Sequence, residues 1–282
     1  MGISFVRGQG SRLHFAPHFL TLVCAVAAFC ALSAWPALGS AQEAAPVVPA
    51  QPAVQARPAR VIEINGTIRA TLVDKLRSAL EPVDPDRFPA GVVILLNSPG
   101  GDGIAAMEAG RLVRAAKAHV FVRGKCASAC VFILAAGVVR GAPEGVVGIH
   151  RARLTTFVKG LGVVDINAAS NPNAARVLEA GDRRTEDYLR EMGMPDTLFQ
   201  AMKGTPSDQT RLLTAPELVE FGLNGVDPAY LEVRTPGAVA GYRMAATDFA
   251  PRSMLVQGRC AAENTPAREF IRCYSRVLRT GE

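Results

Sequence analysis

One serine and one histidine of this 282-residue chain stand where a hydrolytic site needs them. Ser128 lies in the segment G-K-C-A-S-A-C, between a short β-type run and an apolar run, and His150 ends the next apolar run, V-V-G-I-H. A serine hydroxyl attacks a carbonyl carbon when a base removes its proton. Histidine does this near neutral pH because its unperturbed pKa is about 6.5. The pair therefore predicts a serine hydrolase site, with Ser128 as nucleophile and His150 as base.

The elements that must hold Ser128 follow from the pattern around it. His119 to Arg123 is rich in β-branched and aromatic residues, which predicts a strand that Gly124 and Lys125 interrupt. The run 127–136 is apolar on nearly every side, which predicts a buried helix. Ser128 would then lie in the first turn of that helix, where unpaired backbone N–H groups and the helix dipole stabilise negative charge.

A glycine pair follows another predicted strand. Val92 to Leu96 is an uninterrupted apolar run, followed by N-S-P-G-G-D and an amphipathic helix. Glycines let the backbone approach a ligand closely and point N–H groups at it. The N–H groups of Gly101 and Ala129 are therefore the candidates for an oxyanion hole, and Asp102 is expected to cap the helix that follows.

Four motifs follow one another along the chain: N-S-P-G-G, A-S followed by F-I-L-A-A-G, the dipeptide I-H, and L-T-A-P-E-L-V-E-F-G-L. Together, over residues 61–226, they resemble the Clp protease proteolytic subunit and its relatives in the Clp/crotonase superfamily. The resemblance implies an α/β fold of the β-α-β spiral type and peptide-bond hydrolysis by a Ser-His-Asp triad. It also implies that the insertion after His150 is a handle that builds oligomer contacts, or here a lid over the site.

The acidic member of the triad is where the sequence departs from the family pattern. Counting back from A-P-E to the position of the family's aspartate leads to Thr210, and Asp208 lies two residues earlier. Asp208 is the preferred acid, with Asp196, Asp165 or a Ser-His pair without an acid as alternatives. A catalytically inactive relative that binds peptides or partners is therefore the alternative function.

The chain divides into four predicted segments. Residues 1–41 read as a signal peptide, because two arginines precede an apolar run that ends in small residues. A Pro/Ala-rich linker spans 42–60, a Clp-protease-like domain 61–230, and a mostly irregular C-terminal tail with one short helix 231–282. Export, to the periplasm, follows from the leader. An uncleaved leader would instead anchor the protein, although its apolar run falls short of the roughly 18 to 20 residues that span a membrane.

Cysteine use agrees with export. Two of the six cysteines fall in the leader, and an even number remains. Cys260 and Cys273 are predicted to form a disulfide worth about 3 kcal/mol in the chain-entropy model. Cys126 and Cys130 flank Ser128 and are interpreted as two small buried residues. A disulfide between them is the alternative, which requires a distorted first helical turn.

Composition excludes several classes of function. The formal net charge is +6 without a basic patch interleaved with aromatic residues, so nucleic acid is not an expected partner. The chain has no phosphate-binding loop and no cluster of metal ligands, so neither ATP nor any cofactor or metal is expected. The expected partner is a peptide or unfolded protein segment, hydrolysed without ATP, and the handle suggests a homo-oligomer.

Overall fold

A computed structural model describes residues 59–81, 91–166, 168–263 and 265–282 of the chain. The predicted signal peptide, residues 1–41, and nearly all of the predicted linker lie outside the described residues, so their boundaries stay predictions. Within the described part, no helix is both long enough and apolar enough to cross a membrane.

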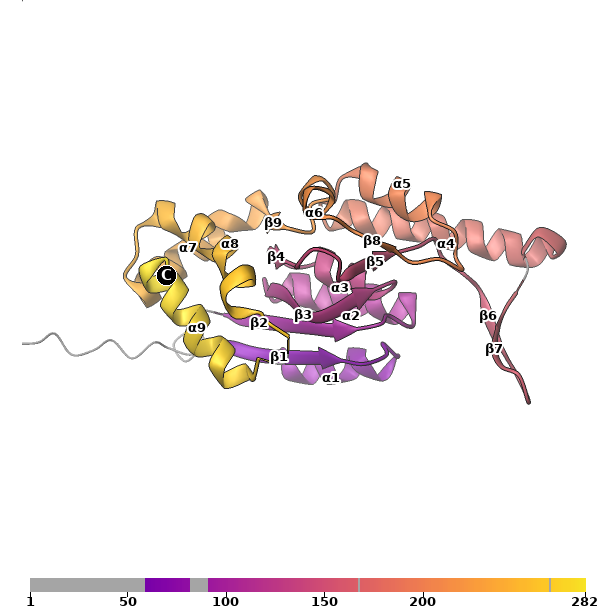
Figure 1. The fold of residues 1–282 in the computed structure, drawn as a ribbon, viewed down its shortest axis with the longest axis horizontal. Helices are drawn as coiled ribbons and strands as arrows, with labels where there is room; N and C mark the ends of the chain where they lie inside the picture. Colours follow the sequence, from indigo (N-terminus) through magenta and orange to yellow (C-terminus); the bar gives the residue numbers. More distant parts are fainter. Residues whose placement is uncertain (1–58, 82–90, 167, 264) are drawn as a thin grey trace, which may run out of the picture. The chain divides into compact units, whose positions relative to one another are not determined.

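The described residues form strands and helices that alternate through the first half of the chain (Figure 1). In chain order the elements are β1 (Arg60–Asn65), α1 (Thr71–Ala79), β2 (Val92–Ser98), α2 (Gly103–Ala115), β3 (His119–Ala127), α3 (Cys130–Ala135), β4 (Val139–Gly141), β5 (Val147–Ile149), β6 (Thr155–Val158), β7 (Gly162–Asp165), η1 (Ala168–Ser170), α4 (Pro172–Glu191), α5 (Asp196–Gly204), β8 (Arg211–Leu212), α6 (Ala215–Glu220), β9 (Gly225–Val226), α7 (Pro228–Tyr242), η2 (Ala246–Asp248), α8 (Phe249–Cys260) and α9 (Ala267–Thr280).

The sheet is mostly parallel and is organised around β3. Its main order is β1-β2-β3-β4-β9, in which only the last pair is antiparallel. The start of β3 pairs with β4, and its end, at Cys126 and Ala127, pairs with β5. β5 in turn pairs with the antiparallel β8. The predicted α/β class is therefore confirmed, and the carboxyl ends of β2, β3 and β5 meet at one edge of the sheet.

Helices cover both faces of the sheet, which is why β2 is apolar from Val92 to Leu96. Alternate residues of β2 enter opposite cores. Val92, Ile94 and Leu96 pack with α1 to α6, whereas Val93 and Leu95 pack with α7 to α9. The hairpin of β6 and β7, which follows His150, projects away from the sheet (Figure 1).

Two sequence expectations around Ser128 are wrong. β3 does not stop at Arg123 but continues to Ala127, because the Asn97 side chain accepts the Lys125 N–H at 3.2 Å and supports the strand where a break was expected. α3 begins at Cys130 rather than at Ala127, because Ala127 is the last residue of β3 and still pairs with β5.

Two further segments are more regular than expected. The stretch after His150 contains the hairpin β6–β7 and η1. The tail expected to be irregular forms α7 and α8 before the predicted helix, which is α9. Pro236 and Pro251 lie inside α7 and α8 and hide their periodicity. Asp227 caps α7 through the Ala229 N–H and pairs with Arg114 of α2 at 2.5 Å, which fixes the start of the tail on the domain.

A buried histidine lies under the tail helices. His119 is fully buried at the start of β3, and its Nδ1 lies 3.0 Å from the hydroxyl of Tyr274 in α9. Burial lowers the pKa of His119 well below its usual value, and the positive charge of Arg234 lowers it further. Below about pH 6.5 His119 therefore binds a proton in the unfolded chain but not in the folded chain.

We expect the free energy of unfolding to fall as the pH drops below about 6.5, by up to about 1.4 kcal/mol per pH unit from this group. The variant His119→Gln removes the titration and should flatten that part of the profile. Urea unfolding at pH 5, 6 and 7 measures the effect in both proteins. Identical pH profiles for wild type and variant would contradict the assignment to His119.

Candidate active site

Ser128 occupies a tight turn between β3 and α3. Its φ is +55°, in the left-handed region that residues other than glycine seldom adopt. Its N–H donates to the carbonyl oxygen of Gly148 in β5 at 2.8 Å, and its own carbonyl accepts the Val131 N–H at 3.0 Å. The first bond continues the β3–β5 ladder by one step, so the backbone of Ser128 lies beside the strand that leads to His150.

The glycine loop after β2 packs against this turn. A Cβ placed on Gly100 would lie 2.5 Å from the carbonyl oxygen of Ala127 and 2.8 Å from Cβ of Ser128. Only glycine leaves room for such contact, and its φ of +94° is also one that a side chain disfavours. Ser98 fixes the loop, because its hydroxyl accepts the Gly100 N–H at 3.1 Å and donates to a backbone carbonyl at 2.6 Å.

The two candidate oxyanion donors have N–H groups without an acceptor in the part of the chain that the structure describes. The neighbours of Gly101 are tied to Ile68, because the Ile68 N–H donates to Gly100 and the Asp102 N–H donates to Ile68. Among the hydrogen bonds of the described residues, neither the N–H of Gly101 nor that of Ala129 has an acceptor. Asp102 caps α2 as predicted, accepting the N–H groups of Ile104 and Ala105.

His150 follows β5 and is half-buried. Its Nδ1 lies 2.7 Å from the carbonyl oxygen of Arg151. A carbonyl oxygen only accepts hydrogen bonds, so this contact requires the proton on Nδ1 and leaves Nε2 with a free lone pair. That tautomer is the one in which Nε2 acts as a base. No hydrogen bond joins His150 to the Ser128 hydroxyl among the described residues.

The acidic candidates lie in three different places. Asp208 is exposed in a turn in which the Gln209 N–H donates to the carbonyl oxygen of Pro206. Among the described residues, Asp208 makes no hydrogen bond with His150. Asp165 pairs with Arg153 at 3.6 Å, and Asp196 is exposed at the start of α5. The choice of Asp208 as the acid therefore stays a prediction.

Thr210 is the residue that lies next to the base strand. The pair Ile149–Arg211 in the β5–β8 ladder brings Thr210 opposite His150 at the next step. Consistent with this register, the Thr210 methyl group would lie 2.5 Å from a Cβ placed on Gly148. The position that the family pattern assigns to an aspartate thus lies opposite His150 in the extended register and holds a hydroxyl residue.

The segment that carries Asp208 and Thr210 is anchored at both ends. At its start the Thr205 carbonyl accepts the Arg151 N–H at 2.9 Å. At its end Glu217 accepts the Thr214 N–H at 2.9 Å and forms an ion pair with Arg211. The bond to Thr214 belongs to the capping box of α6, which the T-A-P-E sequence predicts with Thr214 as N-cap and Glu217 three residues later. Hydrogen bonds from Thr214, with the contact to Arg211, lower the pKa of Glu217.

Both cysteine pairs lie at disulfide distance. Cys260 and Cys273 join α8 to α9 with their Cα atoms 5.5 Å apart, the pair that the sequence predicts. Cys126 and Cys130 are also joined, with Cα atoms 5.2 Å apart, so the alternative of a bond with a distorted turn is the one found. The distortion is the left-handed Ser128 between them.

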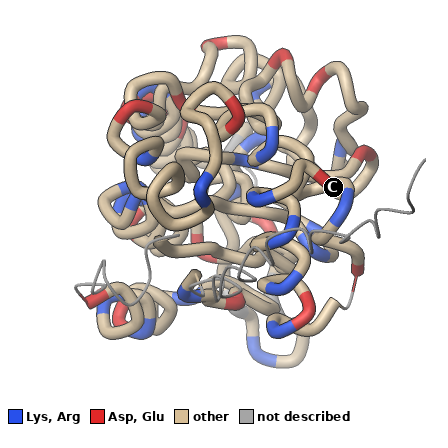
Figure 2. The backbone as a smooth tube through the Cα atoms, turned by 90° about the vertical axis from the view of Figure 1, so that its left-hand side faces the viewer, with Lys and Arg blue, Asp and Glu red and all other residues tan. Residues whose placement is uncertain are grey.

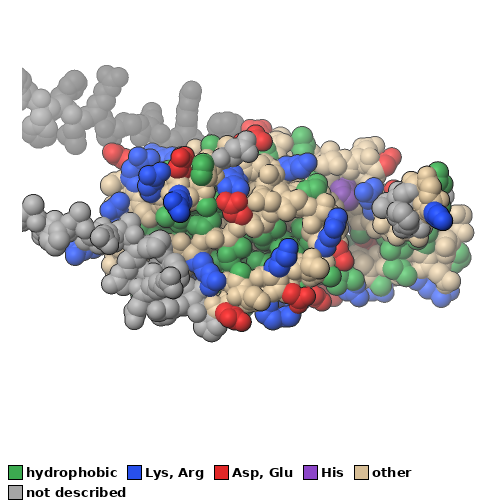
Figure 3. Space-filling view, turned by 90° about the horizontal axis from the view of Figure 1, so that it is seen from below, with side chains coloured by type: hydrophobic (Ala, Val, Ile, Leu, Met, Phe, Trp, Pro, Cys, Tyr) green, Lys and Arg blue, Asp and Glu red, His purple; other side chains and the backbone are tan. Residues whose placement is uncertain are grey.

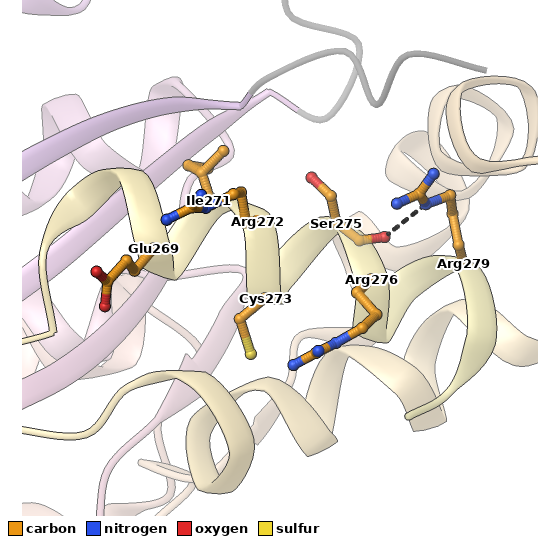
Figure 4. A pocket seen from close by; sticks show the side chains of 7 residues that line it. All are labelled: Glu269, Ile271, Arg272, Cys273, Ser275, Arg276 and Arg279. Carbon is orange, nitrogen blue, oxygen red and sulfur yellow. Dashed lines mark hydrogen bonds between the residues drawn. The ribbon is translucent and has the colours of Figure 1, made fainter. Parts of the chain in front are cut away.

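A cavity lies along α9 and another lies in the segment that follows His150. The larger of the two, about 530 Å³, is lined by residues of α9, among them Cys273 but none of the candidate catalytic residues (Figure 4). The smaller, about 290 Å³, adjoins His150, since residues 151–154, the end of β7, Leu178 of α4 and Ser207 line it. Neither Ser128 nor His150 is among the residues that line the smaller cavity.

Charged groups are spread over the described surface. Figure 2, which looks onto the end formed by α7 to α9, shows basic residues mixed with acidic ones, and so does the face shown in Figure 3. Among the described residues no group of three or more histidines, cysteines or acids is arranged to hold a metal ion.

Sequence reasoning missed two features of this site and ranked a third second. The Arg151 carbonyl that fixes the His150 tautomer is a backbone group and leaves no signal in the sequence. The supporting hydrogen bonds of Asn97 and Ser98 were also missed, although both precede the glycine pair. The bond between Cys126 and Cys130 was not missed but was only the alternative to two unbonded buried cysteines.

Comparisons with known proteins found a matching family and similar solved structures. The model of the Clp protease family matches residues 51–223. A serine-to-alanine mutant of the 1510-N membrane-bound stomatin-specific protease is similar in structure, with 17% sequence identity and a TM-score of 0.46, covering 64% of this chain and 84% of that one. A lysine-to-alanine mutant of the same protease in complex with a substrate peptide has 18% identity and a TM-score of 0.44, covering 64% and 81%. No curated protein matches the chain.

Proposed function

Because the chain belongs to the Clp protease family, a family of serine peptidases, we propose that it hydrolyses peptide bonds with Ser128 as nucleophile and His150 as base. The observation that carries this proposal is the hydrogen bond from the Ser128 N–H to Gly148. This bond holds Ser128 beside β5, and His150 follows Gly148 by two residues, just after the end of that strand.

In the first half of the reaction, Oγ of Ser128 attacks the carbonyl carbon of the peptide while Nε2 of His150 takes the hydroxyl proton. The negative charge that forms on the carbonyl oxygen is stabilised by the N–H groups of Gly101 and Ala129. His150 then gives its proton to the leaving amine, and an acyl-enzyme remains on Ser128. In the second half, His150 takes a proton from a water molecule, which attacks the acyl group. The same two N–H groups stabilise the oxyanion that forms, and Ser128 is released.

Among the described residues the N–H groups of Gly101 and Ala129 have no acceptor, which supports this role, because a donor that already bonds to the backbone is unavailable to an oxyanion. The orientation of His150 is supplied by the Arg151 carbonyl. We keep Asp208 as a candidate third residue, since it lies three residues before Arg211, whose pairing with Ile149 brings this segment alongside the base strand.

The proposed substrate is a peptide or a loosely structured protein segment, with one side chain in the cavity of about 290 Å³ beside His150. We also propose an exported protein, with two disulfides as the supporting observation, because such bonds persist in oxidising compartments. Assembly into a homo-oligomer and anchoring through an uncleaved leader stay predictions.

A serine-directed fluorophosphonate probe tests the proposal. We expect the wild type to be labelled at a single serine between pH 6 and 9, and Ser128→Ala to be unlabelled while keeping its circular dichroism spectrum. Ser78→Ala is the control, because Ser78 is exposed in α1 and lies outside the proposed site. Folded wild type that takes up no probe across this range would remove the hydrolase proposal.

One observation favours the second candidate, a catalytically inactive protein that binds peptides through the same cavity. Thr210 stands where the family pattern has its acid, and Asp208 does not contact His150 among the described residues. An inactive binder would retain labelled peptides in equilibrium binding experiments without cleaving them. Cleavage of those peptides that is lost in Ser128→Ala would exclude it.

A further inference from the structure

The chain closes a small covalent ring around the proposed nucleophile. Cys126 lies near the end of β3, Cys130 is the first residue of α3, and their disulfide leaves Ser128 at the centre of a five-residue loop. Both cysteines are fully buried, so the bond lies beneath the site and does not touch a substrate. We propose that this disulfide is a positioning element that holds Ser128 in its reactive conformation.

The bond forces the chain to reverse direction at Ser128. An extended strand would carry the Cα of Cys130 about 13 Å beyond that of Cys126, whereas the observed separation is 5.2 Å. Cys126 is held in the sheet by Ser98 on one side and Val147 on the other. With one end in the sheet and the other bonded to it, the turn is confined to three residues, and the central one is left-handed.

The same ring also sets the oxyanion donors. Its atoms include the Ala127 carbonyl and the Ala129 N–H, which would lie 2.5 Å and 3.0 Å from a Cβ placed on Gly100. Cys126 is paired in register with Ser98, whose hydroxyl holds the Gly100 N–H. Loss of the bond would therefore make Ser128 more mobile, and its distance from the glycine loop would no longer be fixed.

The sequence itself indicates what the bond opposes. Residues 127–136 are apolar and rich in alanine, a pattern that favours helix from Ala127 onward. In such a helix the φ of Ser128 would be about −63° instead of +55°, and the N–H bond to Gly148 would not form. The disulfide favours the observed turn over this local preference.

The second disulfide provides a matched control. Cys260 and Cys273 enclose a longer loop in α8 and α9, away from Ser128. In the chain-entropy model, removal of the bond that closes the longer loop costs more stability. If activity simply followed stability, the variant without Cys260–Cys273 would therefore be the more impaired of the two.

The test compares Cys126→Ala/Cys130→Ala with Cys260→Ala/Cys273→Ala. The kinetic part rests on the proposed function: we expect the rate constant for fluorophosphonate labelling, and kcat, to fall about tenfold to a hundredfold in the first variant with KM little changed, and to stay within about twofold in the second. A second readout needs no activity. Amide hydrogen exchange of the peptide that contains Ser128 should quicken in the first variant only, because its N–H bond to Gly148 is loosened.

These readouts separate the two proposals. Wild type that takes up no probe would count against the proposed function, and the exchange rate at Ser128 would still decide the role of the bond. Labelling at the wild-type rate with unchanged exchange in Cys126→Ala/Cys130→Ala would overturn the positioning role. If that variant does not fold, the single variant Cys130→Ala, which keeps Cys126 in the sheet core, is measured by the same exchange experiment.

Discussion

Replacement of His150 by alanine is expected to abolish turnover while leaving the fold intact. Removal of the base from a serine hydrolase site lowers kcat by about 10⁴-fold to 10⁶-fold, because the hydroxyl then keeps its proton during attack. His150 is half-buried, and its single hydrogen bond in the structure is a local one to Arg151, so we expect stability to change by less than about 1 kcal/mol.

Cleavage of a fluorescently labelled unfolded protein measures the loss, and thermal unfolding followed by circular dichroism measures stability. Added imidazole should restore part of the activity by occupying the space left by the side chain. Turnover at the wild-type level in His150→Ala would place the base elsewhere. His119 is not an alternative, because it is fully buried and bonded to Tyr274.

Asp208→Asn is the informative companion variant. A loss of about 10⁴-fold would assign Asp208 the orienting role, because that is the effect of the same change in a working triad. Turnover close to the wild-type value would leave that role to the Arg151 carbonyl, which already holds Nδ1 at 2.7 Å.

The second large effect is expected at the glycine loop. In Gly100→Ala the new methyl group would meet the Ala127 carbonyl oxygen and Cβ of Ser128 at 2.5 Å and 2.8 Å. Both contacts are shorter than packed atoms tolerate, so either the loop or the Ser128 turn must move. We expect kcat to fall about a hundredfold or more, since oxyanion donors and nucleophile act only at a set distance from each other.

Gly145→Ala is the matched control for this variant. Gly145 also has a positive φ, +76° against +94° for Gly100, but a Cβ on it would meet no atom within 4 Å. Both variants carry the backbone strain of about 1 kcal/mol, and only Gly100→Ala adds the collision. Steady-state kinetics and thermal unfolding of the two proteins separate strain from contact. Equal kcat values would show that the glycine loop does not set the distance to Ser128.

The sequence by itself determined the parts of this protein that depend on near neighbours. The apolar run 92–96, the cap at Asp102 and the capping box at Thr214 each act within a few residues, and each forms as predicted. The alternation of strands and helices then limits the fold to the α/β class, which the structure and the family match both support.

Only the tertiary structure decided the conformation at the nucleophile. Residues 127–136 alone favour a helix, yet contacts with Gly148 and Gly100, from other parts of the chain, hold Ser128 in a left-handed turn. The proton position on His150 likewise depends on a backbone carbonyl. Local pattern fixes which elements form because helices and strands follow nearest-neighbour rules, whereas the site depends on segments that meet only after the sheet has assembled.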